Sequence, residues 1–348
     1  MKLEGAWTAI VTPFNQDLTV DWDGLRKNVE FQIASGIDGI VPVGTTGESP
    51  TLAWNEHDDV IVRAIQWCGG KIKTLAGTGS NSTEEALRST KHAVEAGANA
   101  VLMVDCYYNG PSSQELRDQY YGVVASAFPN TTVVPYVIPG RSGTALCVED
   151  LAILHGRHPN ISAVKEATGD LTRMAKTRSL LGGDFSIMSG DDDITYKMIS
   201  DSSIRANGVI SVMSNVAPAA VAQMTREAIS GDLEAAAKTR DSLAPLLGIV
   251  TVKVPNQRVL PSGETAEVED RYRNPLAIKT LMAGLGMPSG PCRMPLGKMS
   301  MAGVDVVRNA ARQVWERSPE VLWPVGEFYG VDVAARLADD LIWRSPAL

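Results

Sequence analysis

Apolar and polar residues follow two alternating periods along the first 230 residues of the chain. Short apolar runs rich in β-branched residues occur eight times, at 7–14, 38–45, 73–79, 100–108, 132–139, 161–167, 185–190 and 206–212. Between them lie amphipathic stretches whose apolar residues are three and four positions apart, as at 23–36, 82–97 and 113–128. The short runs predict strands and the amphipathic stretches predict helices. Some of these helices begin at a capping residue and end at glycine, as with Ser82 and Gly97.

Eight strand–helix units of this length predict a (β/α)8 TIM barrel over residues 1–230. The alternative is a doubly wound open sheet, which more often carries a phosphate-binding glycine loop after its first strand. The segment TPFNQD, at 12–17, occupies that place in this chain. The barrel is therefore the favoured prediction.

Residues 231–348 are expected to form a C-terminal helical region. Helical periods lie at 231–250, 275–287 and 300–317. The intervening segment 252–274 is polar and is interrupted by Pro255, Pro261 and Gly263, which predicts a loop insertion.

Composition excludes several classes of partner and location. The chain has 348 residues, of which 44% are hydrophobic and 21% charged, as is usual for a globular protein. Its net charge of −8 offers no basic surface for nucleic acid or for an anionic membrane. No apolar run reaches the ~18–20 residues of a membrane helix, and the start lacks the features of a signal peptide. A cytoplasmic protein is therefore expected.

Metal and dinucleotide sites are not indicated. The four cysteines and four histidines show no zinc-ligand or disulfide spacing. The segment GTGSNS has Ser82 where a dinucleotide fingerprint needs its third glycine. The acidic run 191–193 could hold a cation, but such a run before a helix more often supplies cap and first-turn charges. We expect no metal and no organic cofactor.

Lys165 stands out because it lies in an apolar strand, ISAVKEATGD at 161–170. Burying an ammonium group is costly, which favours the neutral amine. A neutral lysine amine attacks carbonyl groups and forms Schiff bases. On this segment alone, a surface lysine whose stem lies on apolar neighbours is the more ordinary interpretation. The ends of the other strands reverse that preference.

Polar groups follow several predicted strands at their C-terminal ends, where the active sites of such barrels form. The segment VGTTGESPTL places Thr45 and Thr46 between glycines, where hydroxyls and backbone amides could hold a carboxylate. Two further strands end in tyrosines and an arginine, namely Tyr107, Tyr108, Tyr136 and Arg141. Each aromatic residue alone is more often core packing. Together with Lys165 they indicate carbonyl chemistry on an anionic substrate.

These motifs together resemble the dihydrodipicolinate synthase and N-acetylneuraminate lyase family of class I aldolase barrels. The resemblance extends from about residue 5 to residue 312 and rests on GTTGES, the paired tyrosines, Y-x-I-P-x-R-S-G and V-K-E-A-T-G-D. SGDD at 189–192 and NGVISVMSNVAP at 207–218 match the later strands. The Arg141 segment and the paired tyrosines are more similar to the synthase branch than to the sugar-acid lyases.

The resemblance implies an enzyme that condenses pyruvate with L-aspartate-4-semialdehyde to 4-hydroxy-tetrahydrodipicolinate, in lysine and diaminopimelate biosynthesis. It implies a homo-oligomer, either a dimer or a tetramer, and no cofactor. Lys165 would form the Schiff base with pyruvate, and Tyr136 would transfer protons. Thr45 would link Tyr136 to Tyr108 in a relay, with Tyr107 or Tyr108 crossing a dimer interface.

The same resemblance assigns the substrate-binding residues. Thr45, Thr46 and adjacent amides would hold the carboxylate of pyruvate, and Arg141 would hold that of the aldehyde. Gly190 and Ile210 match backbone positions that line the pyruvate pocket.

A second group of residues resembles the L-lysine site of lysine-sensitive family members, namely Ser49, Trp54, His57, Asn81, Glu85 and Tyr107. Glu85 can pair with an ammonium group, and Trp54 can lie along the aliphatic stem of lysine. The alternative is ordinary packing and solvated charge on two helix faces. L-lysine is therefore expected as an inhibitor.

Three features depart from the family pattern. Val137 replaces the usual asparagine beside Tyr136 and could alter substrate choice, 252–274 looks inserted, and 313–348 extends past the usual end. Two other functions stay open. One is another pyruvate-dependent aldolase or hydratase-aldolase acting on a different aldehyde. The other is a non-catalytic ligand-sensing barrel, which predicts the loss of Lys165 or Tyr136.

Overall fold

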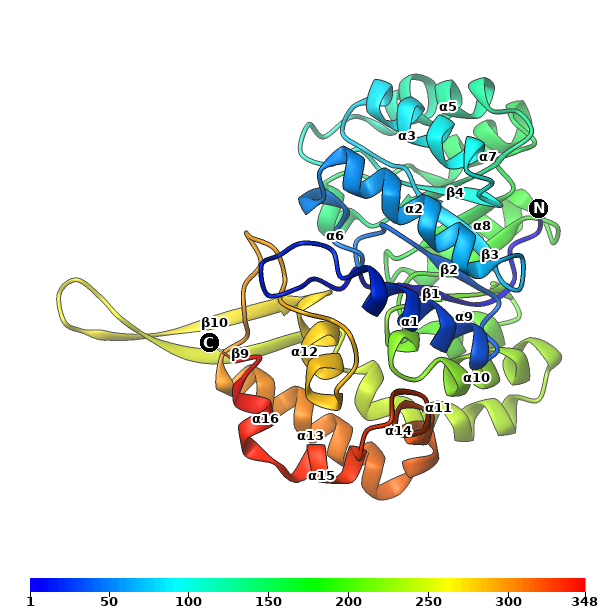
Figure 1. Ribbon diagram of the computed structural model, residues 1–348. Helices are drawn as coiled ribbons and strands as arrows, with labels where there is room; N and C mark the ends of the chain where they lie inside the picture. The colour runs from blue at the N-terminus through cyan, green and yellow to red at the C-terminus, as the bar shows by residue number, and fades with distance from the viewer. Residues whose placement is uncertain (348) are drawn as a thin grey trace.

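A computed structural model describes residues 1–347, and its N-terminal part is a closed barrel of eight parallel strands (Figure 1). The strands follow in sequence order: β1 (Gly5–Ala9), β2 (Gly39–Val41), β3 (Lys73–Gly77), β4 (Ala100–Val104), β5 (Thr132–Val137), β6 (Ala163–Glu166), β7 (Ser186–Ser189) and β8 (Gly208–Ser211). The register of β8 on β1 pairs Gly208 with Gly5 and closes the barrel. The predicted barrel is confirmed. The strands are shorter than the apolar runs because buried residues such as Val11 and Val43 already belong to the loops.

Helices follow the strands and cover the outside of the barrel (Figure 1). They are α1 (Trp22–Ala34), α2 (Trp54–Cys68), α3 (Thr83–Glu95), α4 (Ser113–Glu115), the π-helical turn η2 (Leu116–Tyr121), α5 (Gly122–Ala127), α6 (Pro139–Ser142), α7 (Val148–Arg157), α8 (Leu171–Leu181), α9 (Thr195–Ser200) and α10 (Pro218–Ser230). Short 3-10 turns, η1 (Ser49–Thr51) and η3 (Met213–Asn215), follow β2 and β8. Ser82 caps α3 by accepting a hydrogen bond from the amide of Glu85, as its sequence position predicts.

The alternation of side chains along the strands builds two apolar layers. On β4, for example, Leu102 points into the barrel, whereas Val101 and Met103 pack against the surrounding helices. Leu3 and Trp7 belong to the inner layer and are almost fully buried. The barrel interior is thus a packed core and not an open channel.

The C-terminal region continues the same apolar core. Its helical elements are α11 (Leu233–Leu247), α12 (Leu276–Leu285), α13 (Met301–Arg317), η4 (Pro319–Val321), α14 (Trp323–Tyr329), α15 (Val333–Ala338) and α16 (Asp340–Arg344). They gather on one side of the barrel, where α11 packs beside α10 (Figure 1). The hydroxyl of Tyr329 donates to Oδ1 of Asn28 at 2.9 Å and so joins α14 to α1. The division into domains at residue 230 stays a prediction.

The expectation of a loop over 252–274 is wrong, because this segment forms an antiparallel hairpin of β9 (Thr251–Val259) and β10 (Thr265–Arg273). A two-stranded ribbon leaves alternate N–H groups unpaired along each edge, so Pro255 is tolerated within β9. Pro261 and Gly263 lie in the turn, where Gly263 has a φ of +88°. The residues that suggested irregular structure therefore belong to a ribbon that projects from the body of the molecule (Figure 1). Within residues 1–347, no helix has the length and apolarity needed to cross a membrane.

Candidate active site

Lys165 lies on β6 with its side chain buried at the C-terminal end of the barrel and only 6% exposed. The strand register places it between Tyr136 on β5 and Met188 on β7. Its Nζ lies 4.2 Å from the centroid of the Tyr136 ring. Burial lowers the pKa of Lys165 to about 8, and the nearby carboxylates of Asp191 and Asp192 oppose this shift. At neutral pH a far larger fraction of this amine is neutral than for an ordinary lysine.

Gly190 leaves the space that the Lys165 side chain occupies. A Cβ atom at this position would lie 2.7 Å from Cβ of Ala167 and 3.1 Å from Cε of Lys165. Both distances are shorter than ordinary carbon contacts. The glycine at the end of β7 is therefore needed for the amine to take its observed position.

Tyr136 and Thr45 provide hydroxyls beside the amine. Burial raises the pKa of Tyr136 to about 12, while the charge of Arg141 and a hydrogen bond with Thr45 act in the opposite direction. The phenol is therefore protonated at neutral pH and can donate a proton. Thr45 belongs to the loop after β2, where Val43 has a φ of +49°, a strained conformation for a β-branched residue.

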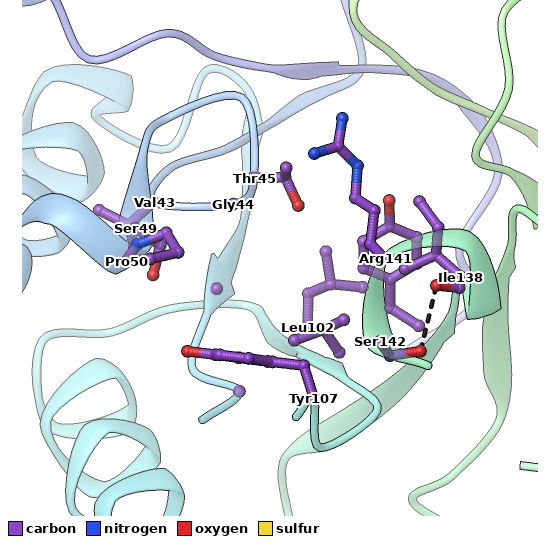
Figure 2. Close-up of a pocket in the computed structure, with 14 residues that line it drawn as sticks. Val43, Gly44, Thr45, Ser49, Pro50, Leu102, Tyr107, Ile138, Arg141 and Ser142 are labelled. Atoms are coloured by element: carbon purple, nitrogen blue, oxygen red, sulfur yellow. Dashed lines mark hydrogen bonds between the residues drawn. The ribbon is translucent and has the colours of Figure 1, made fainter. Parts of the chain in front are cut away.

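These residues line one cavity of about 290 Å³ at the C-terminal end of the barrel. Those expected from the sequence and found in its lining are Thr45, Thr46, Tyr136, Arg141, Lys165 and Gly190. Arg141 extends from α6 toward the side of the site where Thr45 lies (Figure 2). Its Nη2 donates to the carbonyl oxygen of Asn274 at 3.0 Å, and Asn274 in turn donates to Oγ1 of Thr46 at 2.9 Å. Burial is the main cause that lowers the pKa of Arg141.

Three expected residues lie elsewhere. Tyr108 is 93% exposed, with a φ of +76°, and is not brought to Thr45 within one chain. Ile210 is buried in the inner layer of the barrel and is not among the residues that line the cavity. Val137 is buried in the outer layer, facing the helices, so it does not point toward substrate as its position beside Tyr136 had suggested.

Sequence reasoning missed Asp191, which lines the cavity beside Lys165. Burial raises its pKa to about 6, and the charge of Lys165 opposes that shift. The interpretation of the acidic run as cap and first-turn charges is wrong, because α9 has no side-chain cap and no acidic residue in its first turn. Asp192 is buried and accepts hydrogen bonds from the Ser211 hydroxyl and the amides of Val212 and Met213. The available signal was the place of Asp191, two residues after the end of the seventh strand.

Four of the six residues expected to bind L-lysine gather beside the active site. Ser49 and Tyr107 line a second cavity of about 210 Å³ that also contacts Thr45 and Tyr136 (Figure 2). The amide of Tyr107 donates to Oδ1 of Asn81 at 2.9 Å. Glu85 accepts a hydrogen bond from the hydroxyl of Ser80, and both burial and the charge of Glu85 raise the pKa of Tyr107.

Trp54 and His57 have other neighbours. Their rings are 5.2 Å apart on α2, and the guanidinium of Arg88 lies 4.5 Å from the Trp54 ring centroid. His57 is 2% exposed and packs inside the protein. The guanidinium of Arg88 thus covers one face of the Trp54 ring, and a ligand that used this face would have to displace it.

Comparisons with known proteins give one consistent result. Residues 2–314 match the model of the dihydrodipicolinate synthetase family. A 4-hydroxy-tetrahydrodipicolinate synthase of Methanococcus maripaludis is 36% identical over 308 residues, which cover 88% of this chain and 97% of the relative. The synthase of Geobacter sulfurreducens is 41% identical over 298 residues, covering 85% and 93% of the two chains.

Solved structures agree with this result. The 4-hydroxy-tetrahydrodipicolinate synthase of Methylacidiphilum fumariolicum has a TM-score of 0.82 at 33% identity, covering 93% of this chain and 99% of that one. A chloride-inhibited dihydrodipicolinate synthase of Acinetobacter baumannii in complex with pyruvate has a TM-score of 0.79 at 34% identity and covers 89% and 98%. A relative from Cyanidioschyzon merolae with lysine bound has a TM-score of 0.79 at 31% identity and covers 89% and 98%.

Proposed function

Because the chain belongs to the dihydrodipicolinate synthetase family, we propose that Lys165 is the nucleophile with which it binds pyruvate as a Schiff base. The enzyme is a pyruvate-dependent lyase that condenses pyruvate with L-aspartate-4-semialdehyde to 4-hydroxy-tetrahydrodipicolinate, in lysine biosynthesis. One observation carries the assignment of the nucleophile. The Lys165 amine is buried, has a pKa lowered to about 8, and lies directly beside the Tyr136 ring.

The first half of the proposed reaction forms the Schiff base. The neutral amine of Lys165 attacks the keto carbon of pyruvate, while Thr45, Thr46 and neighbouring amides hold the carboxylate. Tyr136 gives a proton to the hydroxyl of the resulting adduct, which leaves as water. The iminium that remains draws electrons from the methyl group, whose proton passes to the phenolate of Tyr136, and the methyl carbon becomes the nucleophilic carbon of an enamine.

The second half joins the enamine carbon to the aldehyde carbon. Arg141 binds the carboxylate of the aldehyde, because a guanidinium can make two parallel hydrogen bonds to a carboxylate. Tyr136 gives this proton to the new alkoxide, and the amino group of the semialdehyde then attacks the iminium carbon, which closes the ring and releases the amine of Lys165. The hydrogen bond from Arg141 to the carbonyl of Asn274 supports this role, because it holds the guanidinium at the cavity.

Tyr108 is proposed to act in a neighbouring subunit of a homo-oligomer, either a dimer or a tetramer. Its 93% exposure in the single chain supports this role, because the ring is free to contact a neighbouring subunit. The relay from Tyr136 through Thr45 to Tyr108 would then join two subunits. The cytoplasmic location stays a prediction.

L-lysine is proposed as an inhibitor that binds beside Tyr107. The relative from Cyanidioschyzon merolae with lysine bound supports the proposal, and so does the position of Ser49, Asn81 and Glu85 around Tyr107. The shared contact of this cavity with Thr45 and Tyr136 offers a direct route from ligand to catalytic hydroxyls.

Borohydride trapping tests the proposed nucleophile. Incubation with pyruvate and borohydride should add a reduced pyruvate group to Lys165, located by peptide mass spectrometry, and Lys165→Ala should lose both the adduct and the activity. An adduct on another lysine, or full activity in Lys165→Ala, would reject the assignment.

A further inference from the structure

The hairpin β9–β10 brings two additional arginines into the active-site cavity. Arg271 and Arg273 lie two positions apart on β10, so both point to the same face of the ribbon. Tyr272 points to the opposite face, where its hydroxyl accepts a hydrogen bond from the amide of Ser300 at 3.0 Å. Both arginines line the cavity that holds Lys165.

Reciprocal hydrogen bonds fasten the root of the hairpin to α6. Nη1 of Arg273 donates to the carbonyl oxygen of Gly140 at 2.8 Å, and Nη2 of Arg141 donates to the carbonyl oxygen of Asn274 at 3.0 Å. The charges of Arg273 and Arg271 add to burial in lowering the pKa of Arg141. The guanidinium of Arg141 is therefore close enough to each of the other two for their charges to repel it.

No carboxylate within residues 1–347 forms an ion pair with these three arginines, although other arginines of the chain are paired. Arg258, for example, lies 2.6 Å from Asp270, and Arg293 lies 2.7 Å from Glu56. Asp191 is the one acidic residue among the described lining residues, and the charge it meets is that of Lys165. Three unpaired cations in one cavity are costly in the empty protein, and a bound anion would remove that cost.

We propose that Arg271 and Arg273 form, together with Arg141, the site that binds the anionic end of the aldehyde substrate. The inference rests on the proposed function and extends it from one arginine to three. Lys165 lies buried, whereas Arg273 is half-buried and Arg271 is exposed, so the arginines occupy the outer part of the cavity. Pyruvate bound at Lys165 would lie deeper, and the second substrate would meet the arginines. The hairpin thus selects aldehydes that carry a carboxylate.

Three variants test this site: Arg271→Ala, Arg273→Ala and the double variant. The KM for L-aspartate-4-semialdehyde should rise about 10-fold to 100-fold in the double variant, because each lost hydrogen bond to a charged group weakens binding substantially. The rate of borohydride trapping with pyruvate should stay unchanged. Arg273→Lys should recover only part of the affinity, because an ammonium lacks the planar fork of a guanidinium.

Arg258→Ala is the matched control. It removes the same charge from the same hairpin, but Arg258 is paired with Asp270 and lies outside the cavity lining. Its KM for the aldehyde should equal that of the wild type. A KM in the double variant equal to that of Arg258→Ala would overturn the inference, and so would an equal loss of pyruvate trapping, which indicates a structural role.

An uncharged aldehyde separates this site from the rest of the mechanism. With propanal in place of the semialdehyde, the wild type and the double variant should turn over at equal kcat/KM, because propanal has no carboxylate. An equal loss on both aldehydes would reject the carboxylate site. Failure of the wild type to trap pyruvate at Lys165 would instead reject the proposed function, so the two failures are distinguishable.

Discussion

Replacement of Gly190 by alanine should displace the Lys165 amine and slow Schiff-base formation. The added Cβ would lie 2.7 Å from Cβ of Ala167 and 3.1 Å from Cε of Lys165. Ordinary carbon contacts are about 3.5–4.0 Å, so the lysine stem must move by about 0.4–0.9 Å and Ala167 by somewhat more. Ala167 follows β6 directly and has little freedom, whereas the lysine stem can rotate. A misplacement of about 1 Å costs about 100-fold in rate, so we expect a 10-fold to 100-fold loss.

The assay is the single-turnover rate of pyruvate trapping by borohydride at saturating pyruvate, which reports Schiff-base formation without the aldehyde step. Gly156→Ala is the control, because a Cβ at Gly156 meets no atom within 4 Å. Thermal melting of both variants establishes that they are folded. Trapping by folded Gly190→Ala at the wild-type rate would refute the reasoning, because it would mean that the position of the amine does not limit the reaction.

Three further predictions concern single groups. The rate of pyruvate trapping should rise with pH with a midpoint near 8, since the neutral amine reacts and burial lowers the pKa of Lys165 to about 8. In Asp191→Asn this midpoint should move to lower pH, because the carboxylate that raises the pKa of Lys165 is gone. A midpoint near 10 would contradict the lowered pKa. Lys279→Met should lower the free energy of unfolding by about 3–5 kcal/mol. It removes the buried partner of Glu48, whose carboxylate lies 2.7 Å from the Lys279 ammonium. The urea midpoint measures this loss of stability, and a wild-type midpoint would show that Glu48 finds another partner. Millimolar L-lysine should inhibit partially and raise the melting temperature, and Glu85→Ala should lose both effects; calorimetry that detects no lysine binding by the wild type would reject the regulatory site alone.

The barrel could be predicted from the sequence because its two periods repeat eight times and each strand ends near polar residues. Lys165 could be found for the same reason, since a lysine in an apolar strand breaks the pattern. The hairpin could not be found in this way. Apolar alternation is confined to the start of β9, where Val252 and Val254 are buried and Lys253 and Pro255 are exposed. The outer part of the ribbon is exposed on both faces and carries no such pattern, so the alternating stretch is too short to mark two strands. Its Pro255 is typical of loops and is equally compatible with a ribbon edge.

The missing parts of the site depend on contacts between distant segments. Asp191 faces Lys165 only because β6 and β7 are neighbours, and Arg271 enters the cavity only through the root of the hairpin. The paired tyrosines show the same limit. Sequence places Tyr107 and Tyr108 together, but the backbone turns one toward the cavity of Ser49 and the other outward.

The seam between β1 and β8 has a consequence for the synthesis of the chain. Gly5 pairs with Gly208, so β1 can pair with β8 only after 203 further residues have been synthesised (208 − 5 = 203). At about 5–20 residues per second, one edge of β1 remains without its final neighbour for roughly 10–40 seconds on the ribosome. An open strand edge is a template for pairing with other chains. Premature aggregation of nascent chains should therefore depend on how quickly the second half of the barrel emerges, and slower translation of residues 130–210 should lower the yield of folded enzyme.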